Sequence, residues 1–511
     1  MTLGRRTLVN AIFNTMSWGL PMVLSFFILP YIVTRLGNDA YGILTMVLTI
    51  IGYFAFLDLG LGNAVVKYVA EYNAEGDSDK LNGVVGTIFF LLLVLGGIGG
   101  AGILLVARPM AAKFLQIPPH LVDAAFTAFC VGALGFVFTV LLSFVSAIPN
   151  GLNRYDVSSI VSVTIGTITT AGTAVILYFG FGLLQIVWYN IAVTAAGVIS
   201  YWILVKRLAP ALRIRPVLRR DMLKHVISFG MYSVLRRIAY LVNYHADRLV
   251  IGALLGIASV TYYVVPFTMV SRLTSITVRI GQVIFPAISE LQGQRRYGAI
   301  NELYVVASRV ICAVAVSICI PLAIFGRRLL TLWMGQDFGE HAGWVMVIVT
   351  LALFFSALTN VPSYVVEGLG LPRISGFAAF GCALLNVGLA IPLAKPFGIT
   401  GVAIAFLASN AVIAPIFIGY VNGRVLKLPL WRTLSDAYLR PFLCGLLTLT
   451  PFLFISQESI GNLFLLLGVV ASASCCYLVA CFLLGVFPQQ VEILVHGFFR
   501  KGLRRNENTA G

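Results

Sequence analysis

Apolar runs of membrane-spanning length recur along almost the whole chain, and they restrict it to one class of fold. They begin near residues 9, 42, 84, 122, 158, 182, 226, 258, 304, 342, 374, 400, 439 and 463. A transmembrane helix needs about 20 such residues. Hydrophobic residues make up 59% of the 511 and charged residues only 11%, more apolar surface than a soluble core could bury. The sequence predicts an all-α polytopic membrane protein with about 14 transmembrane helices.

Lysine and arginine are divided unequally between the two sides of this predicted topology. With an even number of spans both termini share a side, which carries 23 of these residues against six on the other. The positive-inside rule places the richer side, and so both termini, in the cytoplasm. The heaviest loop, residues 206–224, holds seven cations and is expected to link two halves. Basic loops also explain the net charge of +16, so no nucleic acid is expected as a partner.

Short sequence matches recur at nearly one spacing. Leu36-Gly37 matches Leu255-Gly256, residues 151–154 resemble 368–371, and residues 181–183 resemble 397–399, at offsets of 216 to 219. They predict two six-helix lobes, a parallel repeat around a central cleft, as in transporters that rock one half against the other. The expected parts are an N-terminal lobe (1–215, helices 1–6), a C-terminal lobe (216–430, helices 7–12), helices 13–14 (431–490) and a basic cytoplasmic tail (491–511).

Six arginines lie inside three consecutive predicted spans: Arg236, Arg237, Arg248, Arg272, Arg279 and Arg309. A cation near the bilayer centre costs roughly 2.5 kcal/mol or more, so such residues usually face a wet cavity. Arg236, Arg237 and Arg272 lie near mid-membrane and are expected to line a cationic substrate cavity. The other three lie nearer the span ends, where reaching out to the interface is the alternative. Lys67 in the second span is a further candidate cation of this cavity.

Polar and aromatic residues share helix faces with these cations. On the seventh predicted helix the polar residues, except His245, fall within an arc of about 140° that includes Arg236 and Arg237. A second polar stripe follows the first helix, where helix–helix contact through small polar residues is the alternative. The candidate sugar contacts on the two faces are Asn10, Asn14, Ser17, Tyr240, Asn243 and Tyr244.

Two aspartates lie within predicted spans. Asp58 stands in the segment Asp58-Leu59-Gly60-Leu61-Gly62, where two glycines loosen the helix. A buried carboxylate is costly unless it is paired or protonated, so Asp58 either pairs with a cavity arginine or carries a coupling proton. Asp247, beside Arg248, is a second candidate for ion pairing or coupling. A proton or a sodium gradient is left open as the driving force.

Motifs for catalysis and metal binding are missing from the sequence. It has no Gly-x-x-x-x-Gly-Lys-Ser/Thr phosphate loop, no His/Glu metal pair on a helix and no Gly-x-Ser-x-Gly elbow. The eight cysteines lack metal-ligand spacing and are interpreted as small packing residues. No catalytic residue, metal or cofactor is expected. A membrane polysaccharide polymerase or glycosyltransferase is the alternative of another class, although no outer loop is long enough for such a site.

Four short motifs resemble those of a known transporter superfamily. They are Leu-Gly-Asn-Asp-Ala-Tyr-Gly at 36–42, Phe-Leu-Asp-Leu-Gly-Leu-Gly-Asn at 56–63, Ala-Asp-Arg-Leu-Val-Ile-Gly at 246–252 and Phe-Gly-Ile-Thr-Gly-Val-Ala at 397–403. With them, the chain from about residue 5 to 425 resembles the polysaccharide-transport and O-antigen flippases. These belong to the multidrug/oligosaccharidyl-lipid/polysaccharide exporter superfamily.

This resemblance implies a flippase that moves an undecaprenyl-pyrophosphate-linked oligosaccharide across the bacterial inner membrane for surface polysaccharide biosynthesis. Arginine forks suit the oxygens of a pyrophosphate, in agreement with the cationic spans. A lipid II flippase and a multidrug antiporter are the alternatives within the superfamily. The expected partners are the lipid-linked oligosaccharide, membrane lipid and a polymerase of the same pathway, with the chain itself a monomer. Helices 13–14 are a hypothetical guide for the polyprenyl tail.

Overall fold

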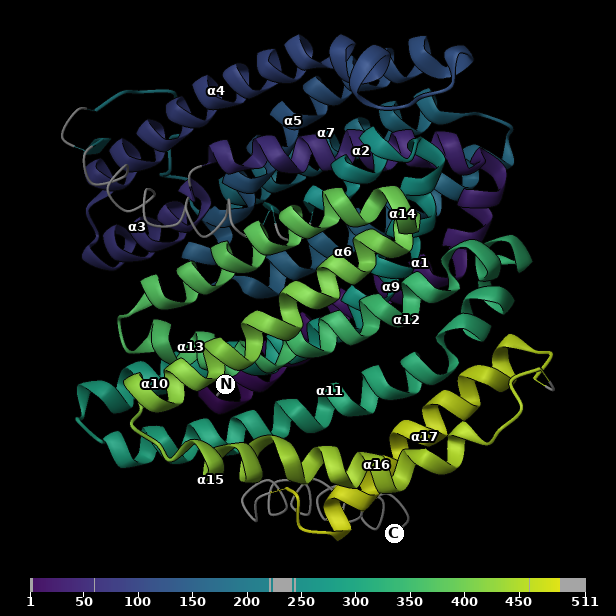
Figure 1. Ribbon diagram of the computed structural model, residues 1–511. Helices are drawn as coiled ribbons and strands as arrows, with labels where there is room; N and C mark the ends of the chain where they lie inside the picture. Colours follow the sequence, from purple (N-terminus) through teal and green to yellow (C-terminus); the bar gives the residue numbers. More distant parts are fainter. Residues whose placement is uncertain are drawn as a thin grey trace, which may run out of the picture. The chain divides into compact units, whose positions relative to one another are not determined.

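Every regular secondary-structure element in the described part of the chain is a helix (Figure 1). The computed structural model describes residues 3–58, 60–219, 222–223, 241–242, 245–458 and 460–487, with no side-chain description for 3–18, 20 and 432. Within these ranges, nine helical segments are long and apolar enough to span a membrane. The expected all-α, multi-pass membrane protein is therefore confirmed. The count of fourteen spans stays a prediction, since the seventh falls mainly outside the described residues.

The first of two compact units covers Met1–Val264. Its elements are α1 (Leu3–Leu36), α2 (Asn38–Phe54), η1 (Ala55–Asp58), α3 (Leu61–Glu75), α4 (Ser78–Pro109), η2 (Met110–Phe114), η3 (Pro119–Leu121), α5 (Val122–Gly151), α6 (Tyr155–Tyr178) and α7 (Leu183–Leu208). Helix α5 packs against α7 and α4, and α1 packs against α6. The unit also holds the first residues of α9 (Ile257–Gln282).

The second unit covers Val265–Gly511. After the rest of α9 come α10 (Ile284–Gly293), α11 (Tyr297–Met334), α12 (Gln336–Leu358), α13 (Asn360–Gly368), α14 (Pro372–Tyr420), η4 (Val421–Val425), α15 (Leu430–Leu434), η5 (Ser435–Leu439), α16 (Arg440–Leu453) and α17 (Leu463–Leu483). The units meet inside α9, whereas the predicted lobes divide at residue 215. The lobe boundary describes a sequence repeat and stays a prediction.

Glycine sets two breaks in the helices. Gly60 has φ +72° and separates η1 from α3, so the predicted loosening of the second span is confirmed as a full break. Gly398 has φ +57° and divides α14 where the eleventh predicted span ends and the twelfth begins. Three residues on, Gly401 packs its backbone against the carbonyl of Leu393, where a Cβ would collide. A left-handed backbone carries little strain only in glycine, which explains both break positions.

Left-handed turns mark matching places along the chain. Positive φ angles occur in the pairs Gly37 and Gly256, Gly76 and Arg295, Asn153 and Gly370, and Gly180 and Gly398. Their separations are 219, 219, 217 and 218 residues. The turns precede α2 and α9, α4 and α11, α6 and α14, and α7 and the second part of α14. The same order of turns thus occurs twice.

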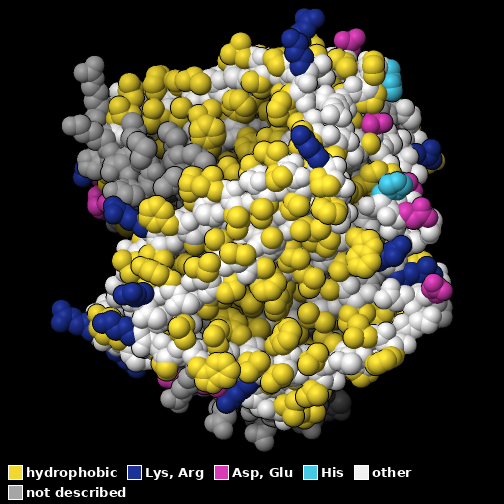
Figure 2. Space-filling view, viewed as in Figure 1, with side chains coloured by type: hydrophobic (Ala, Val, Ile, Leu, Met, Phe, Trp, Pro, Cys, Tyr) yellow, Lys and Arg dark blue, Asp and Glu magenta, His cyan; other side chains and the backbone are white. Residues whose placement is uncertain are grey.

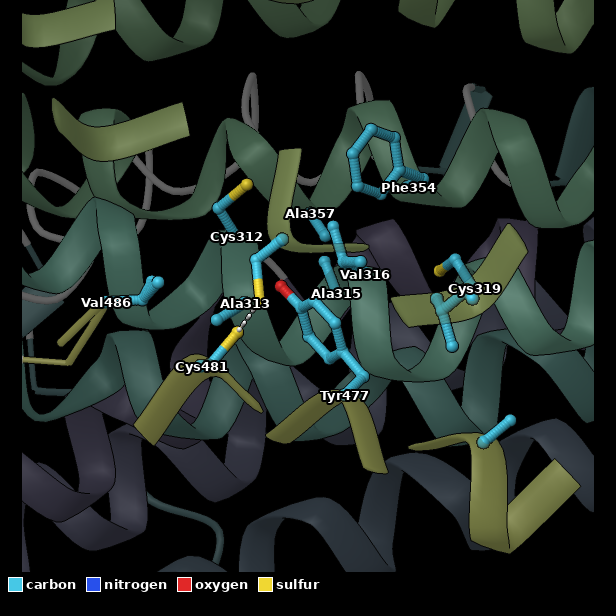
Figure 3. Packing of buried hydrophobic residues seen from close by; sticks show 13 residues of the cluster. Cys312, Ala313, Ala315, Val316, Cys319, Phe354, Ala357, Tyr477, Cys481 and Val486 are labelled. Carbon is cyan, nitrogen blue, oxygen red and sulfur yellow. Dashed lines mark hydrogen bonds between the residues drawn. The ribbon is translucent and has the colours of Figure 1, made fainter. Parts of the chain in front are cut away.

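The last two helices, α16 and α17, share a core with α11 and α12 (Figure 3). Cys312 and Val316 of α11 lie near the buried Tyr477 of α17, whose hydroxyl donates to the Pro441 carbonyl at 3.0 Å. The Sγ atoms of Cys444 and Cys481 are 3.6 Å apart. Five of the eight cysteines are buried, in agreement with a packing role.

The outer surface is strongly apolar. Figure 2 shows hydrophobic side chains over much of the face in view. Among the exposed residues, Leu105, Leu447 and Phe454 are 79%, 72% and 86% accessible. A soluble monomer rarely exposes apolar patches of this kind, whereas lipid tails cover them without cost.

Candidate functional site

A polar stripe runs along the open face of α9. Thr268, Arg272 and Ser275 are partly exposed, and Arg279 and Gln282 are exposed. Their spacing keeps all five within about 80° of one another on the helix. The opposite face is buried at Val270, Thr274, Thr277 and Gly281. Arg272 lies 15 residues from the start of the 26-residue α9, about 22 Å along its axis. We call this set the α9 stripe.

Behind the stripe, α9 is fixed to the neighbouring α13. Asn360 Nδ2 donates to Thr277 Oγ1 at 3.0 Å, and Thr277 is only 1% exposed. A Cβ on Gly281 would lie 2.6 Å from the ring of Tyr364. Close packing on one side thus holds the two arginines on the other.

The predicted cation and acid of the second span occupy different environments. Asp58 is 5% exposed at the end of η1, just before the break at Gly60. Lys67 is exposed on α3, with Nζ 4.7 Å from the centre of the Tyr68 ring. An acid is therefore buried at the break, and the cation lies on an accessible face.

Arg248 and Asp247 belong to a buried polar cluster in the first unit. Arg248 Nη1 donates to Thr49 Oγ1 at 3.1 Å. Asp247 is 1% exposed and accepts from the Tyr263 hydroxyl at 2.6 Å. Nearby, the rings of Tyr53 and His245 meet edge to face, with centroids 6.2 Å apart. These contacts tie residues 245–263 to α2.

Further contacts bind the same segments at the end marked by Gly37 and Gly256. Asn38 Nδ2 donates to the Tyr262 hydroxyl at 2.8 Å, and Thr261 Oγ1 donates to the Asn38 carbonyl at 2.7 Å. The Gln116 N–H donates to the Gly252 carbonyl at 3.0 Å. Gly42 packs against the Ile257 carbonyl so closely that a Cβ would collide. We call these the end contacts.

Arg309 lies where α11 meets the helices that follow α14. Its Nε donates to the Asp436 carbonyl at 2.6 Å, and its Nη1 lies 3.5 Å from the Val486 carbonyl. It also lines a pocket of about 340 Å³ with Asn301, Glu302 and Thr433. Near the other end of α11, Arg328 donates to the carbonyls of Ile460 (Nε, 3.0 Å) and Glu458 (Nη2, 3.3 Å). The two arginines hold α16 and α17 against α11.

Sequence reasoning missed two of these features. It treated Arg328 as an outer-loop residue, and it placed loop 206–224 as a simple linker, although residues 213–219 bind to α4. The close glycines Gly83 and Gly86, spaced along one face of α4, were the available signal for a chain packing there.

Several predicted site residues lie outside the described part of the chain: Arg236, Arg237, Tyr240, Asn243 and Tyr244, together with the side chains of Asn10, Asn14 and Ser17. Among the residues that are described, no group of three His, Cys, Asp or Glu side chains could hold a metal ion. The described candidate residues are thus the α9 stripe in the second unit and, in the first unit, Asp58, Lys67 and the Asp247–Arg248 cluster.

Solved membrane transporters share this arrangement of helices. A lipid II flippase, MurJ, in an inward closed conformation matches with a TM-score of 0.71 and 13% identity, covering 93% of this chain and 98% of that one. An inward-facing multidrug resistance MATE family transporter of the MOP superfamily matches with a TM-score of 0.65 and 17% identity, covering 80% and 95%. At these identities the likeness concerns the fold.

Sequence relatives point the same way. A Shigella flexneri protein named "Putative O-antigen transporter" is 22% identical over 405 residues, 78% of this chain and 93% of the relative. EpsK, an uncharacterized membrane protein of Bacillus subtilis, is 21% identical over 443 residues, 81% of this chain and 83% of the relative. The named functions among these relatives and neighbours are transport and flipping, and none is an enzyme activity.

The family model described as polysaccharide biosynthesis protein matches residues 7–292, which is more than half of the chain. This agrees with the resemblance carried by the motifs at 36–42, 56–63 and 246–252. The chain belongs to the polysaccharide biosynthesis protein family.

Proposed function

We propose that this protein flips an undecaprenyl-pyrophosphate-linked oligosaccharide across the bacterial inner membrane by alternating access. Family membership, a relative named as an O-antigen transporter and a flippase-like fold support this assignment. The product would serve the synthesis of O-antigen or exopolysaccharide. A polymerase of the same pathway would take over the flipped substrate.

The α9 stripe is the observation that carries the proposal. It places Arg272 in the second half of α9 and Arg279 in its last turn, on one accessible helix face beside hydroxyl and amide groups. Guanidinium groups bind pyrophosphate oxygens through paired hydrogen bonds, while hydroxyls and amides suit sugars. Arg236 and Arg237 are proposed to join Arg272 around the pyrophosphate. Lys67 would contribute from the first half.

The twice-repeated order of left-handed turns supports two six-helix halves followed by α16 and α17. Turns at offsets of 217 to 219 agree with the sequence matches at 216 to 219. With fourteen spans and both termini in the cytoplasm, Gly37, Gln116 and Gly256 would all lie on the outer side. The end contacts would then close that side, leaving access from the cytoplasm, where the lipid-linked substrate is made.

A lipid II flippase is the second candidate, favoured by the match to MurJ at a TM-score of 0.71. Lipid II also carries a pyrophosphate, so the α9 stripe would suit it equally well. A multidrug antiporter of cationic compounds fits less well, because the stripe is itself cationic and would repel them.

Flipping in proteoliposomes tests the proposal directly. Fluorescent undecaprenyl-pyrophosphate oligosaccharide is incorporated, and exchange between leaflets is followed with and without a proton or sodium gradient. Wild-type protein should flip this substrate faster than lipid II. The triple variant Arg236→Ala/Arg237→Ala/Arg272→Ala should show no flipping above protein-free vesicles. Arg296→Gln, which removes an exposed cation after α10, is the control and should flip normally. No exchange by folded wild-type protein would sink the proposal, and faster lipid II exchange would favour the second candidate.

A further inference from the structure

The segment that follows α7 lies along the first turns of α4 and is fixed there. We call residues 209–219 the strap. Backbone N–H groups of Arg213, Val217 and Arg219 donate to Asn82 Oδ1, the Gly86 carbonyl and Thr87 Oγ1, at 2.6, 3.3 and 3.2 Å. Three bonds from one short irregular segment to a single helix give the strap a defined course.

Two glycines and an ion pair make the close approach possible. A Cβ on Gly83 would lie 2.8 Å from Arg219 Cδ, and a Cβ on Gly86 would lie 2.7 Å from the Arg215 carbonyl. Arg219 Nη1 and Nη2 donate to the two carboxylate oxygens of Asp79 at 2.8 and 2.9 Å. The ion pair between Arg219 and Asp79 therefore helps to hold the strap on α4.

The remaining cations of this region are exposed. Lys206 and Arg207 in the last turn of α7, and Arg213 and Arg215 in the strap, are all exposed. No acidic residue occurs between 206 and 219. Val217 and Leu218 are each 47% exposed between these cations and Arg219. The outward face therefore combines four cations with two apolar side chains.

This face lies beside the membrane because of its covalent neighbours. α7, which ends at Leu208, and α4, which begins at Ser78, both have the length and composition of membrane spans. A strap bound to the start of one span and continuous with the end of another lies near the membrane surface, where charges act over a screening length of about 8 Å at physiological salt. Exposed cations with apolar side chains are the pattern of segments that lie in an anionic membrane surface.

We propose that the strap is a binding surface for anionic phospholipid headgroups. Arg213 and Arg215 bind headgroup phosphates, and Val217 and Leu218 insert between the headgroups. Because Arg219 and the backbone bonds hold the strap on α4, little ordering is needed when lipid binds, which favours binding. The proposed topology is needed only to say which leaflet the strap contacts, and it assigns the cytoplasmic one. It does not depend on which substrate is flipped.

Lipid retention by the full-length protein tests this surface. Detergent-solubilised protein is titrated with phosphatidylglycerol or phosphatidylcholine, and bound lipids are counted by native mass spectrometry. The variant is Arg213→Gln/Arg215→Gln, and the control is Arg295→Gln/Arg296→Gln, an equal charge loss in the turn after α10. Each cation contributes about five-fold to anionic lipid binding, so the variant, which removes two, should lower the preference for phosphatidylglycerol by about 25-fold. The control should change it less than two-fold.

An equal drop in both double variants would overturn the proposal in favour of general electrostatics. An unchanged preference in the strap variant would also overturn it and assign these cations to a soluble anionic partner. Competition with glycerol phosphate shows whether the site binds lipid headgroups or free phosphate. Millimolar glycerol phosphate should not displace phospholipid from a membrane-surface site. Flipping is measured separately, so failure of the transport proposal leaves this result intact.

Discussion

The segments α2–η1–α3 and α9–α10 have the same design but opposite chemistry. Each is a long helix that breaks and continues as a short helix, and Gly37 and Gly256 precede them 219 residues apart. At that offset Tyr53 corresponds to Arg272, Asp58 to Thr277 and Gly60 to Arg279. The first segment buries an acid at its break, while the second carries two arginines on its open face. Corresponding segments of the chain therefore carry charges of opposite sign near their breaks.

The largest effect is expected at the acid of the first segment. Asp58→Ala should lower the free energy of unfolding by about 3 kcal/mol, because it removes a buried carboxyl group and leaves the group that contacts it without its polar partner. Its counterpart Thr277→Val should cost about 1 kcal/mol through the lost acceptor for Asn360. Thermal and denaturant unfolding in detergent measure both. If Asp58→Ala and Thr277→Val lowered the free energy of unfolding equally, the two segments would not differ in how they stabilise the protein.

A smaller effect, on transport rather than stability, is expected at the cation of the second segment. Arg272→Gln should slow flipping about 30-fold, since a charge-assisted hydrogen bond contributes roughly 2 kcal/mol. Arg272→Lys should recover part of the rate, and Tyr53→Gln at the matching position should change it less than about three-fold. Comparable losses at Tyr53 and Arg272 in the flipping assay would show that the two faces contribute equally.

The next prediction separates a substrate-binding arginine from a structural one. Arg309→Gln should lower the free energy of unfolding by about 1.5 kcal/mol, the scale of one hydrogen bond from a charged donor. Flipping should stay within about two-fold of wild type, because Arg309 binds carbonyls of the final helices. A loss of flipping without a loss of stability would show that Arg309 binds substrate in the cationic cavity instead.

The smallest effect is expected at the break itself. Gly60→Ala should destabilise the protein by about 1 kcal/mol, because φ at Gly60 is +72° and a Cβ strains that backbone. Gly52→Ala, in the helical part of α2 with open space around the site, is the matched control and should be neutral or slightly stabilising. The melting temperatures of the two variants measure this difference in stability. A tolerated Gly60→Ala would mean that the break is not set by glycine.

Structural features that depend on long apolar helices or on glycine could be predicted from the sequence. The all-α membrane fold followed from apolar runs, and the break at Gly60 from its glycine pair. Contacts with backbone carbonyls could not be predicted, because a carbonyl gives no side-chain signal. Arg309 therefore looked like a cavity cation, and the strap looked like a linker. The predicted sites at Arg236 and Arg237 remain predictions.

The two arginines of α11 have a consequence for how this chain can vary. Arg309 and Arg328 recognise the main chain at Asp436, Glu458 and Ile460, so the attachment of α16 and α17 does not depend on which side chains stand there. These positions can change freely as long as the local backbone path is kept. The side chains that α16 and α17 bury against α11, such as Cys444 and Tyr477, are the ones that cannot change freely, so variation at this end of the chain should concentrate in the connecting segments.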